Sequence, residues 1–86
     1  MNIEFLENFK ISPEGPWINF WAEVDGNRIH CKVFIDALQD HNSSNAHLAP
    51  ELLFEQDDAY FKNIARNKIM APGFNGKNVS ITIFDI

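Results

Sequence analysis

The chain has 86 residues, a length typical of one small domain, and we expect residues 1–86 to form a single domain. Hydrophobic residues make up 45% of the sequence, which indicates a globular fold and excludes a disordered chain. The formal net charge is -5. A negative protein repels phosphates, so this charge disfavours nucleic acid as a partner.

Three sequence features predict a cytoplasmic location. Cys31 is the only cysteine, so no internal disulfide can form and a reducing compartment is expected. The start of the chain, Met1–Glu7, has acidic residues where a secretory signal needs basic ones. No apolar run approaches the roughly 18 residues of a membrane span, so we expect no membrane association.

Alternating apolar residues predict three strands in the first half of the chain: a short one at Ile3 and Phe5 with a weak continuation toward Ile11, and two more at about residues 17–24 and 28–35. Asp25-Gly26 is a strong hairpin signal, because a type I′ turn needs positive φ at both central residues. A turn at Asp25-Gly26 pairs Trp21 with His30. A turn one residue later pairs Trp21 with Lys32 instead, and the turn chemistry favours the first register.

The second half of the chain carries helical signals. Asp36 is predicted to cap a short helix that ends near His41, with Gln39 completing a capping box. Pro50 suits the first turn of the next helix. That helix should break at Asp57, since an unbroken helix would place Asp57 in its apolar stripe and a break lets it cap a second segment.

Pro72-Gly73 ends the helical region, and Asn75-Gly76 turns the chain into a last strand at residues 78–85. The predicted order is β-β-β-α-α-β. This order implies an α+β fold, a two-layer sandwich with a mostly antiparallel sheet of about four strands and helices packed on one face.

The predicted hairpin has two different faces. One face is apolar and forms the core; it contains Phe20, Ala22, Val24, Ile29, Cys31 and Val33. The other face mixes aromatic and charged side chains, and its candidate binding residues are Trp17, Trp21, Arg28, His30, Lys32 and Phe34. Phe84 in the last predicted strand has the same phase. Four clustered aromatic side chains would offer on the order of 600–1000 Å² of contact surface.

Three kinds of cover are possible for this second face. Residues 6–16 of the same chain could fold across it. A second copy of the chain, giving a homodimer, or another protein partner could pack on it. The third possibility is a ligand face, in which tryptophan stacks on the ligand while Arg28, His30 and Lys32 contact an anion.

Residues with catalytic or metal-binding chemistry are few. Cys31 alternates inward with its neighbours, so we expect a buried and unreactive thiol. Asp40, His41 and His47 are the only candidates for a metal site, but a flexible Ser/Asn loop is a poor frame for rigid coordination. We expect no cofactor and assign no catalytic residue.

The run VDGNRIHCKVFIDALQDH, residues 24–41, resembles a small bacterial family known as domain of unknown function 1488. The helix sequence NIARNKI, residues 63–69, is similar to the helix of that family. The chain departs from the family pattern at Asn42-Ser43, where the family usually has an aromatic residue and a glycine. The resemblance supports the fold and implies a bacterial cytoplasmic origin, but it supplies no activity.

Together these features predict a non-enzymatic binding or regulatory module, for which a homodimer through the outer face of the sheet is one of the arrangements left open. The alternative is a small-molecule or metal-dependent enzyme that uses the Asp40/His41/His47 loop.

Overall fold

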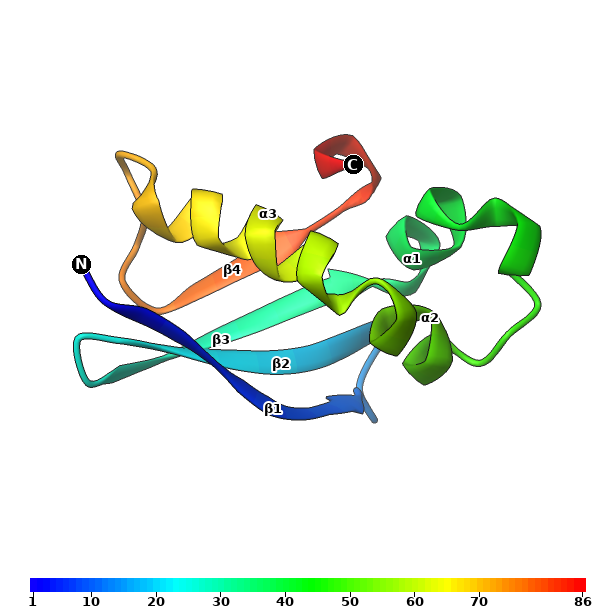
Figure 1. Cartoon of the computed structure of the whole chain (residues 1–86), viewed down its shortest axis with the longest axis horizontal. Helices are drawn as coiled ribbons and strands as arrows, with labels where there is room; N and C mark the ends of the chain where they lie inside the picture. Colours follow the sequence, from blue (N-terminus) through cyan, green and yellow to red (C-terminus); the bar gives the residue numbers. More distant parts are fainter.

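The computed structural model describes all 86 residues and contains one four-stranded sheet with helices along it (Figure 1). The elements in chain order are β1 (Ile3–Ile11), β2 (Trp17–Val24), β3 (Asn27–Phe34), α1 (Ile35–His41), the 3-10 turn η1 (Ser43–Asn45), α2 (Pro50–Gln56), α3 (Asp58–Met70), β4 (Asn78–Ile81) and the 3-10 turn η2 (Ile83–Asp85). This arrangement confirms the predicted α+β fold. No helix has the length and apolar character needed to cross a membrane.

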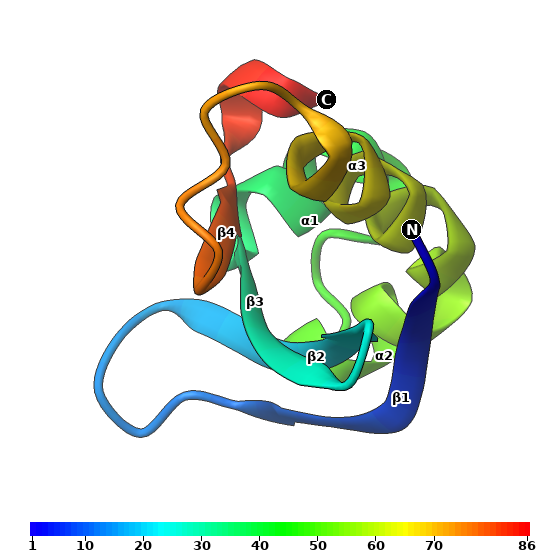
Figure 2. The same cartoon turned by 90° about the vertical axis from the view of Figure 1, so that its left-hand side faces the viewer.

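The sheet has the strand order β1-β2-β3-β4 and is mixed. Its β1–β2 and β2–β3 pairs are antiparallel, whereas β4 pairs with β3 in parallel. Parallel strands cannot be joined by a tight hairpin, and here the long connection through α1, α2 and α3 returns the chain to the same end of the sheet. Figure 2 shows the helices gathered on the concave side of the curved sheet, while the β1–β2 loop projects on the other side.

The β2–β3 hairpin has the predicted register. Trp21 lies opposite His30, and Glu23 lies opposite Arg28. Asp25 and Gly26 both have positive φ values, 50° and 88°, as a type I′ turn requires. The turn chemistry therefore selected the correct register of the two that matched the apolar faces.

The strand β1 lies along the edge of the sheet beside β2 and does not cross the outer face. Its register shifts between Phe5, which pairs with Ala22, and Phe9, which pairs with Phe20. The intervening residues bulge opposite Trp21. Phe5 and Phe9 pack against the hydrophobic core. Of residues 6–16, which were one of the three covers considered, only the short β1–β2 loop contacts the outer face, through Gly15 against Trp17.

The predicted break in the second helix is present between α2 and α3, and Pro50 begins α2 as expected. Two predictions about the N-terminal caps of the helices α1 and α3 were wrong. The helix α1 starts at Ile35 directly from the end of β3, so Asp36 lies in the first turn instead of at the cap. Asp57 occupies the cap position of α3, but its side chain accepts no capping hydrogen bond. Its carboxylate instead lies near His41, with Oδ2 3.9 Å from Nε2.

Aromatic side chains fill the centre of the core. The ring of Phe54 from α2 lies 5.0 Å from that of Phe20 on β2 and 4.9 Å from that of Phe9 on β1, measured between centroids. Phe61 from α3 joins the same cluster and is fully buried. These contacts fix the helices on the inner face of the sheet and leave its other face uncovered.

The last strand is shorter than predicted. The strand β4 ends at Ile81, and Thr82 then begins the turn η2. Thr82 and Asp85 form a reciprocal capping box, and Asp85 also binds Lys68 of α3 at 2.9 Å. This local hydrogen bonding ends the strand, so Phe84 is 91% exposed on the turn and does not belong to the outer face of the sheet.

Candidate functional site

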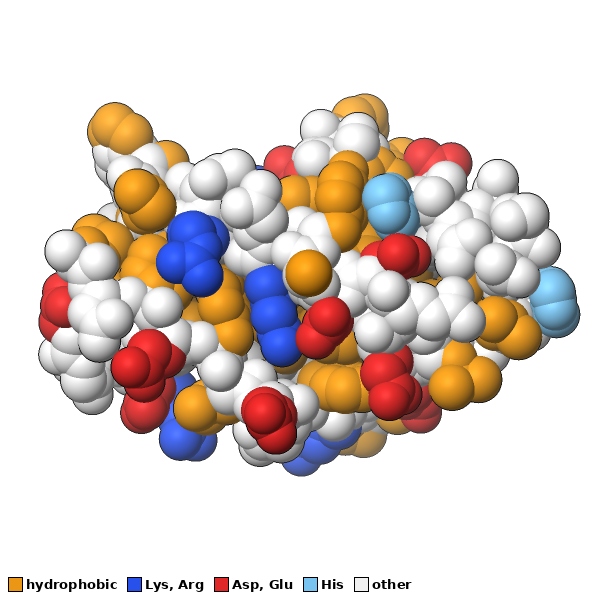
Figure 3. Space-filling model, viewed as in Figure 1, with side chains coloured by type: hydrophobic (Ala, Val, Ile, Leu, Met, Phe, Trp, Pro, Cys, Tyr) orange, Lys and Arg blue, Asp and Glu red, His pale blue; other side chains and the backbone are white.

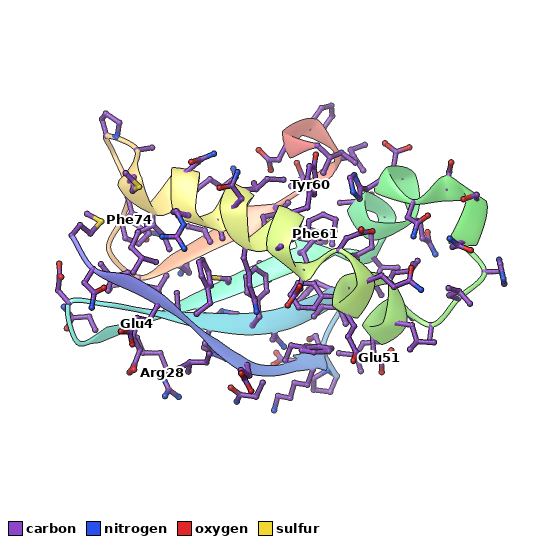
Figure 4. The ribbon with its side chains drawn as sticks, in the orientation of Figure 1. Glu4, Arg28, Glu51, Tyr60, Phe61 and Phe74 are labelled. Atoms are coloured by element: carbon purple, nitrogen blue, oxygen red, sulfur yellow. The ribbon has the colours of Figure 1, made fainter.

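The outer face of the sheet is the side of β2 and β3 that points away from the helices. Its residues are Trp17, Asn19, Trp21 and Glu23 on β2 and Arg28, His30, Lys32 and Phe34 on β3. Figure 4 shows Arg28, together with Glu4 of β1, on the side of the sheet opposite α3. The aromatic rings of Trp17 and Phe34 lie in the half of this face that is farther from the Asp25-Gly26 turn.

Trp17 is held from several sides. A Cβ atom added to Gly15 would lie 2.0 Å from the Trp17 ring, so the indole packs directly on the glycine backbone. The Lys32 ammonium lies 4.4 Å from the centroid of the ring, in a cation–π contact. Phe34 meets the indole edge to face, at 5.8 Å between centroids. Trp17 is therefore a rigid wall of the outer face.

Asn19 lies at the centre of the face and is only 8% exposed. Its Oδ1 accepts a hydrogen bond from Trp17 Nε1 at 2.9 Å and lies 2.6 Å from His30 Nε2. An indole nitrogen can only donate, so this contact fixes which end of the amide is the oxygen. No protein group accepts from the Nδ2 atom, and no fully buried side-chain polar atom lacks a partner, so Nδ2 reaches the surface.

The same contact determines the form of His30. Because Asn19 Oδ1 is an acceptor, His30 Nε2 carries the proton and donates it. Burial, and then the positive charge of Lys32, lower the pKa of His30 below its usual value of 6.5. The imidazole is therefore neutral at pH 7, with its proton on Nε2 and a lone pair on Nδ1.

A hollow of about 290 Å³ opens beside these side chains, lined by Ser12, Glu14, Trp17, Asn19, Trp21 and His30. Trp21 is partly buried and lies against His30, with 6.0 Å between the ring centroids. Its indole N–H has no protein acceptor. The bulge in β1 faces Trp21, and bulges commonly re-aim side chains beside binding sites.

The structure brings only half of the candidate binding residues to this hollow. Trp17, Trp21 and His30 line it, whereas Arg28, Lys32 and Phe34 do not. Its other lining residues, Asn19, Ser12 and Glu14, were not predicted from the sequence. A usable signal was present in Trp-Ile-Asn-Phe-Trp, where a polar residue stands between two tryptophans on one face of a strand.

The residues considered for a metal site do not converge. His41 stacks on Tyr60, at 3.9 Å between ring centroids and an angle of 15°, while Asp40 and His47 are exposed. No three His, Cys, Asp or Glu side chains in the chain are grouped so that they could hold a metal ion. Figure 3 shows two separate patches of histidine atoms on the helix side, and Figure 4 places Tyr60 next to Phe61 at the start of α3.

Cys31 is fully buried between β2 and β4, as its inward phase predicts. Burial raises the pKa of its thiol to about 12. A thiol with this pKa carries almost no thiolate at neutral pH, and only the thiolate is a good nucleophile.

A second hollow, of about 300 Å³, lies where α3 ends and β4 begins. Asn75 is the most prominent polar side chain there, but its amide is already satisfied. Its Oδ1 accepts from the backbone N–H groups of Lys77 and Asn78, and its Nδ2 donates to Asn78 Oδ1. This hollow is the predicted helix stop and turn, and the hollow beside Asn19 is the better candidate site.

Comparisons with known proteins agree with the resemblance noted in the sequence. A search of curated proteins and of solved structures gave no match. The model of the family described as "Protein of unknown function (DUF1488)" matches residues 3–81, which is most of the chain and includes every element from β1 to β4. The chain therefore belongs to the DUF1488 family.

Proposed function

We propose that this protein is a non-enzymatic binding module and that its ligand is a small organic molecule seated in the hollow beside Asn19. One observation carries the proposal. Asn19 is nine-tenths buried, its oxygen is used twice within the protein, and its Nδ2 atom is left without a protein acceptor at the hollow. Because Nδ2 reaches the surface of an otherwise buried side chain, a ligand acceptor in the hollow can replace water there and complete the hydrogen bonds of the amide.

The surroundings of Asn19 support the same proposal. The wall formed by Trp17 is immobilised by Gly15, Lys32 and Phe34 before any ligand arrives. A preformed site loses less conformational entropy on binding than a flexible one. Trp21 adds a partly exposed aromatic ring with a free indole N–H, which suits a molecule that both stacks and accepts a hydrogen bond.

A second copy of the chain is the competing occupant. The homodimer considered from the sequence depended on four clustered aromatic side chains, but Phe84 lies elsewhere on the exposed turn. Trp17, Trp21 and Phe34 are each partly buried. A stable interface covers about 800 Å² on each partner, and the exposed aromatic surface here fits a small ligand better.

The proposal contains no chemical step. The strongest potential nucleophile, the Cys31 thiol, is buried and has a pKa of about 12. His41, from the loop considered for an enzyme, is stacked on Tyr60. We further propose a cytoplasmic location in a bacterium, since the lone cysteine suits a reducing compartment and the resemblance implies that origin.

A fragment screen tests this proposal directly. Trp17 and Trp21 are the two tryptophans of the chain and both line the hollow, so their indole N–H signals in NMR report on it. We expect aromatic fragments from a general library to shift both indole signals and the Asn19 side-chain amide. In Trp21→Ala only the Trp17 indole and the Asn19 amide signals remain, and we expect fragments to leave both unshifted while the circular dichroism matches that of the wild type.

The matched control is Phe84→Ala, which removes an aromatic side chain that is 91% exposed and does not line the hollow. It should bind the same fragments as the wild type. The proposal is wrong if no fragment shifts the two indole signals. It is also wrong if these signals shift with protein concentration alone while light scattering reports a dimer, because a second copy then occupies the face.

A further inference from the structure

The outer face of the sheet carries the cations Arg28 and Lys32, but neither of them lines the hollow. None of its lining residues is a lysine or arginine. Lys32 is placed over Trp17, and Arg28 lies opposite Glu23 near the end of the hairpin. His30 is neutral at pH 7, because burial and the charge of Lys32 lower its pKa. The only charge in the lining is the Glu14 carboxylate, while the Lys32 ammonium lies outside the lining, 4.4 Å from the centroid of the Trp17 ring, so no lining side chain offers an anion a cationic partner.

The hydrogen-bonding groups in the hollow define a pattern. Asn19 Nδ2 and Trp21 Nε1 are donors that lack protein partners. Glu14 supplies an acceptor, and it is exposed on the β1–β2 loop, where its backbone N–H donates to Ser12 Oγ at 3.0 Å. A ligand that satisfies both sides must therefore carry an acceptor for Asn19 and a donor for Glu14.

The shape of the site restricts the ligand further. Trp17 and Trp21 stand two residues to either side of Asn19 on one strand, so all three side chains project from the same face. Flat rings stack on such indole surfaces with little loss of conformational freedom. A planar ring that bears an oxygen acceptor beside an N–H donor meets the shape and the hydrogen-bonding pattern together.

We propose that the hollow recognises an uncharged planar ring that carries an amide or lactam group, with the carbonyl oxygen on Asn19 and the N–H directed to Glu14. This inference rests on the proposed binding function and names the chemical class of its ligand. The sequence had suggested an anionic ligand held by Arg28, His30 and Lys32. We infer an uncharged ligand instead, because Arg28 and Lys32 lie outside the lining. A carboxylate would satisfy Asn19 but would face Glu14, and an amidinium would satisfy Glu14 but would present N–H groups to Asn19.

Three probes of almost equal shape separate these cases: benzamide, benzoate and benzamidine. Each is titrated into labelled protein at pH 7, and the shifts of the Trp17 and Trp21 indole signals give the affinity. We expect benzamide to bind most tightly. Benzoate should bind about fivefold more weakly or worse, since like charges repel across the exposed rim. Benzamidine should also be weaker than benzamide.

Two variants link these affinities to the named residues. Glu14→Gln removes an exposed charge and should leave the fold intact, while bringing benzoate to within about twofold of benzamide. Asn19→Asp replaces the free donor by an acceptor and should reverse the preference, so that benzamidine binds better than benzamide. If Asn19→Asp fails to fold, Glu14→Gln alone decides the outcome.

The outcomes of these titrations distinguish an error in the ligand class from an error in the proposed binding function. Tightest binding of benzoate or of benzamidine to the wild type, or an unchanged benzoate-to-benzamide ratio in Glu14→Gln, overturns the ligand class and leaves the binding function standing. Failure of all three probes while other library fragments shift the indole signals does the same. Failure of the whole library overturns the binding function and this inference with it.

Discussion

The indole nitrogen of Trp17 lies 2.9 Å from the side-chain oxygen of Asn19, two residues along the same strand. The same oxygen lies 2.6 Å from His30 Nε2 on the neighbouring strand. One amide oxygen thus links the two central strands on their outer face and orients both rings. A substitution of Asn19 should therefore alter the environment of both the Trp17 indole and the His30 imidazole.

Asn19→Ala removes the shared acceptor and leaves two donors, on Trp17 and His30, without a partner. We expect the free energy of unfolding to fall by about 1–3 kcal/mol, the usual penalty for unsatisfied groups in a partly buried setting. Urea denaturation measures this loss. Asn67→Ala, at an exposed position of α3, is the control and should change stability by less than about 0.5 kcal/mol. Equal stabilities of the two variants would contradict the role given to Asn19.

Gly15→Ala tests how tightly Trp17 is held. The added methyl group would lie 2.0 Å from the indole, so the ring must move away and weaken its bond to Asn19. We expect a loss of about 1–3 kcal/mol, as for other overpacked sites, and a changed tryptophan emission spectrum. Pro13→Ala in the same loop, an exposed position, should leave the spectrum unaltered. An unchanged spectrum in Gly15→Ala would show that Trp17 does not pack on this glycine.

Gly26→Val tests the hairpin turn. Gly26 has a φ of 88°, a region that a β-branched residue avoids, although no atom lies within 4 Å of the position of a Cβ. Backbone strain alone should therefore destabilise the variant by at least about 1 kcal/mol. Thermal unfolding followed by circular dichroism measures the effect. Wild-type stability in this variant would mean that the turn adopts another geometry.

The features that the sequence predicted are local ones. The register at Trp21 and His30 follows from a two-residue turn, and the burial of Cys31 follows from simple alternation. The parallel pairing of β4 with β3 could not be predicted, because it depends on where a long helical connection returns the chain. Alternation also placed Phe84 on the outer face, since it could not detect that Thr82 and Asp85 end the strand.

Only part of the candidate site was predicted, because the alternation of residues in a strand reports local structure and not tertiary contacts. Alternation assigns Trp17, Asn19 and Trp21 to one face of β2, but it does not tell how deeply each is buried. The depth of Asn19 results from the loop that places Gly15 against Trp17 and from the neighbouring strand that supplies His30. These are tertiary contacts, so the central residue of the hollow was missed while its aromatic walls were found.

The thiol of Cys31 should be inert in the folded protein. It is fully buried, and burial raises its pKa to about 12, so both access and ionisation are suppressed. We expect a thiol reagent at pH 8 to label the native protein slowly and the urea-denatured protein rapidly. Native labelling as fast as that of the denatured chain would contradict both the burial and the raised pKa.

The last prediction concerns the dependence of stability on pH. Burial and the charge of Lys32 lower the pKa of His30 in the folded protein, so the unfolded chain binds a proton at this residue more readily. The contribution of His30 to stability is therefore complete above about pH 6.5, the value for the unfolded chain, and falls as the pH drops toward the lower pKa of the folded state.

The variant His30→Gln isolates this contribution, because a glutamine amide can still donate to Asn19 but does not titrate. His41 and His47 are present in both proteins, so the comparison reports on His30 alone. We expect the free energy of unfolding, measured by urea denaturation between about pH 5 and pH 7.5, to fall more steeply on acidification in the wild type than in the variant. A steeper fall in the variant would mean that His30 is charged in the folded protein, and the neutral hollow inferred from its lowered pKa would then be wrong.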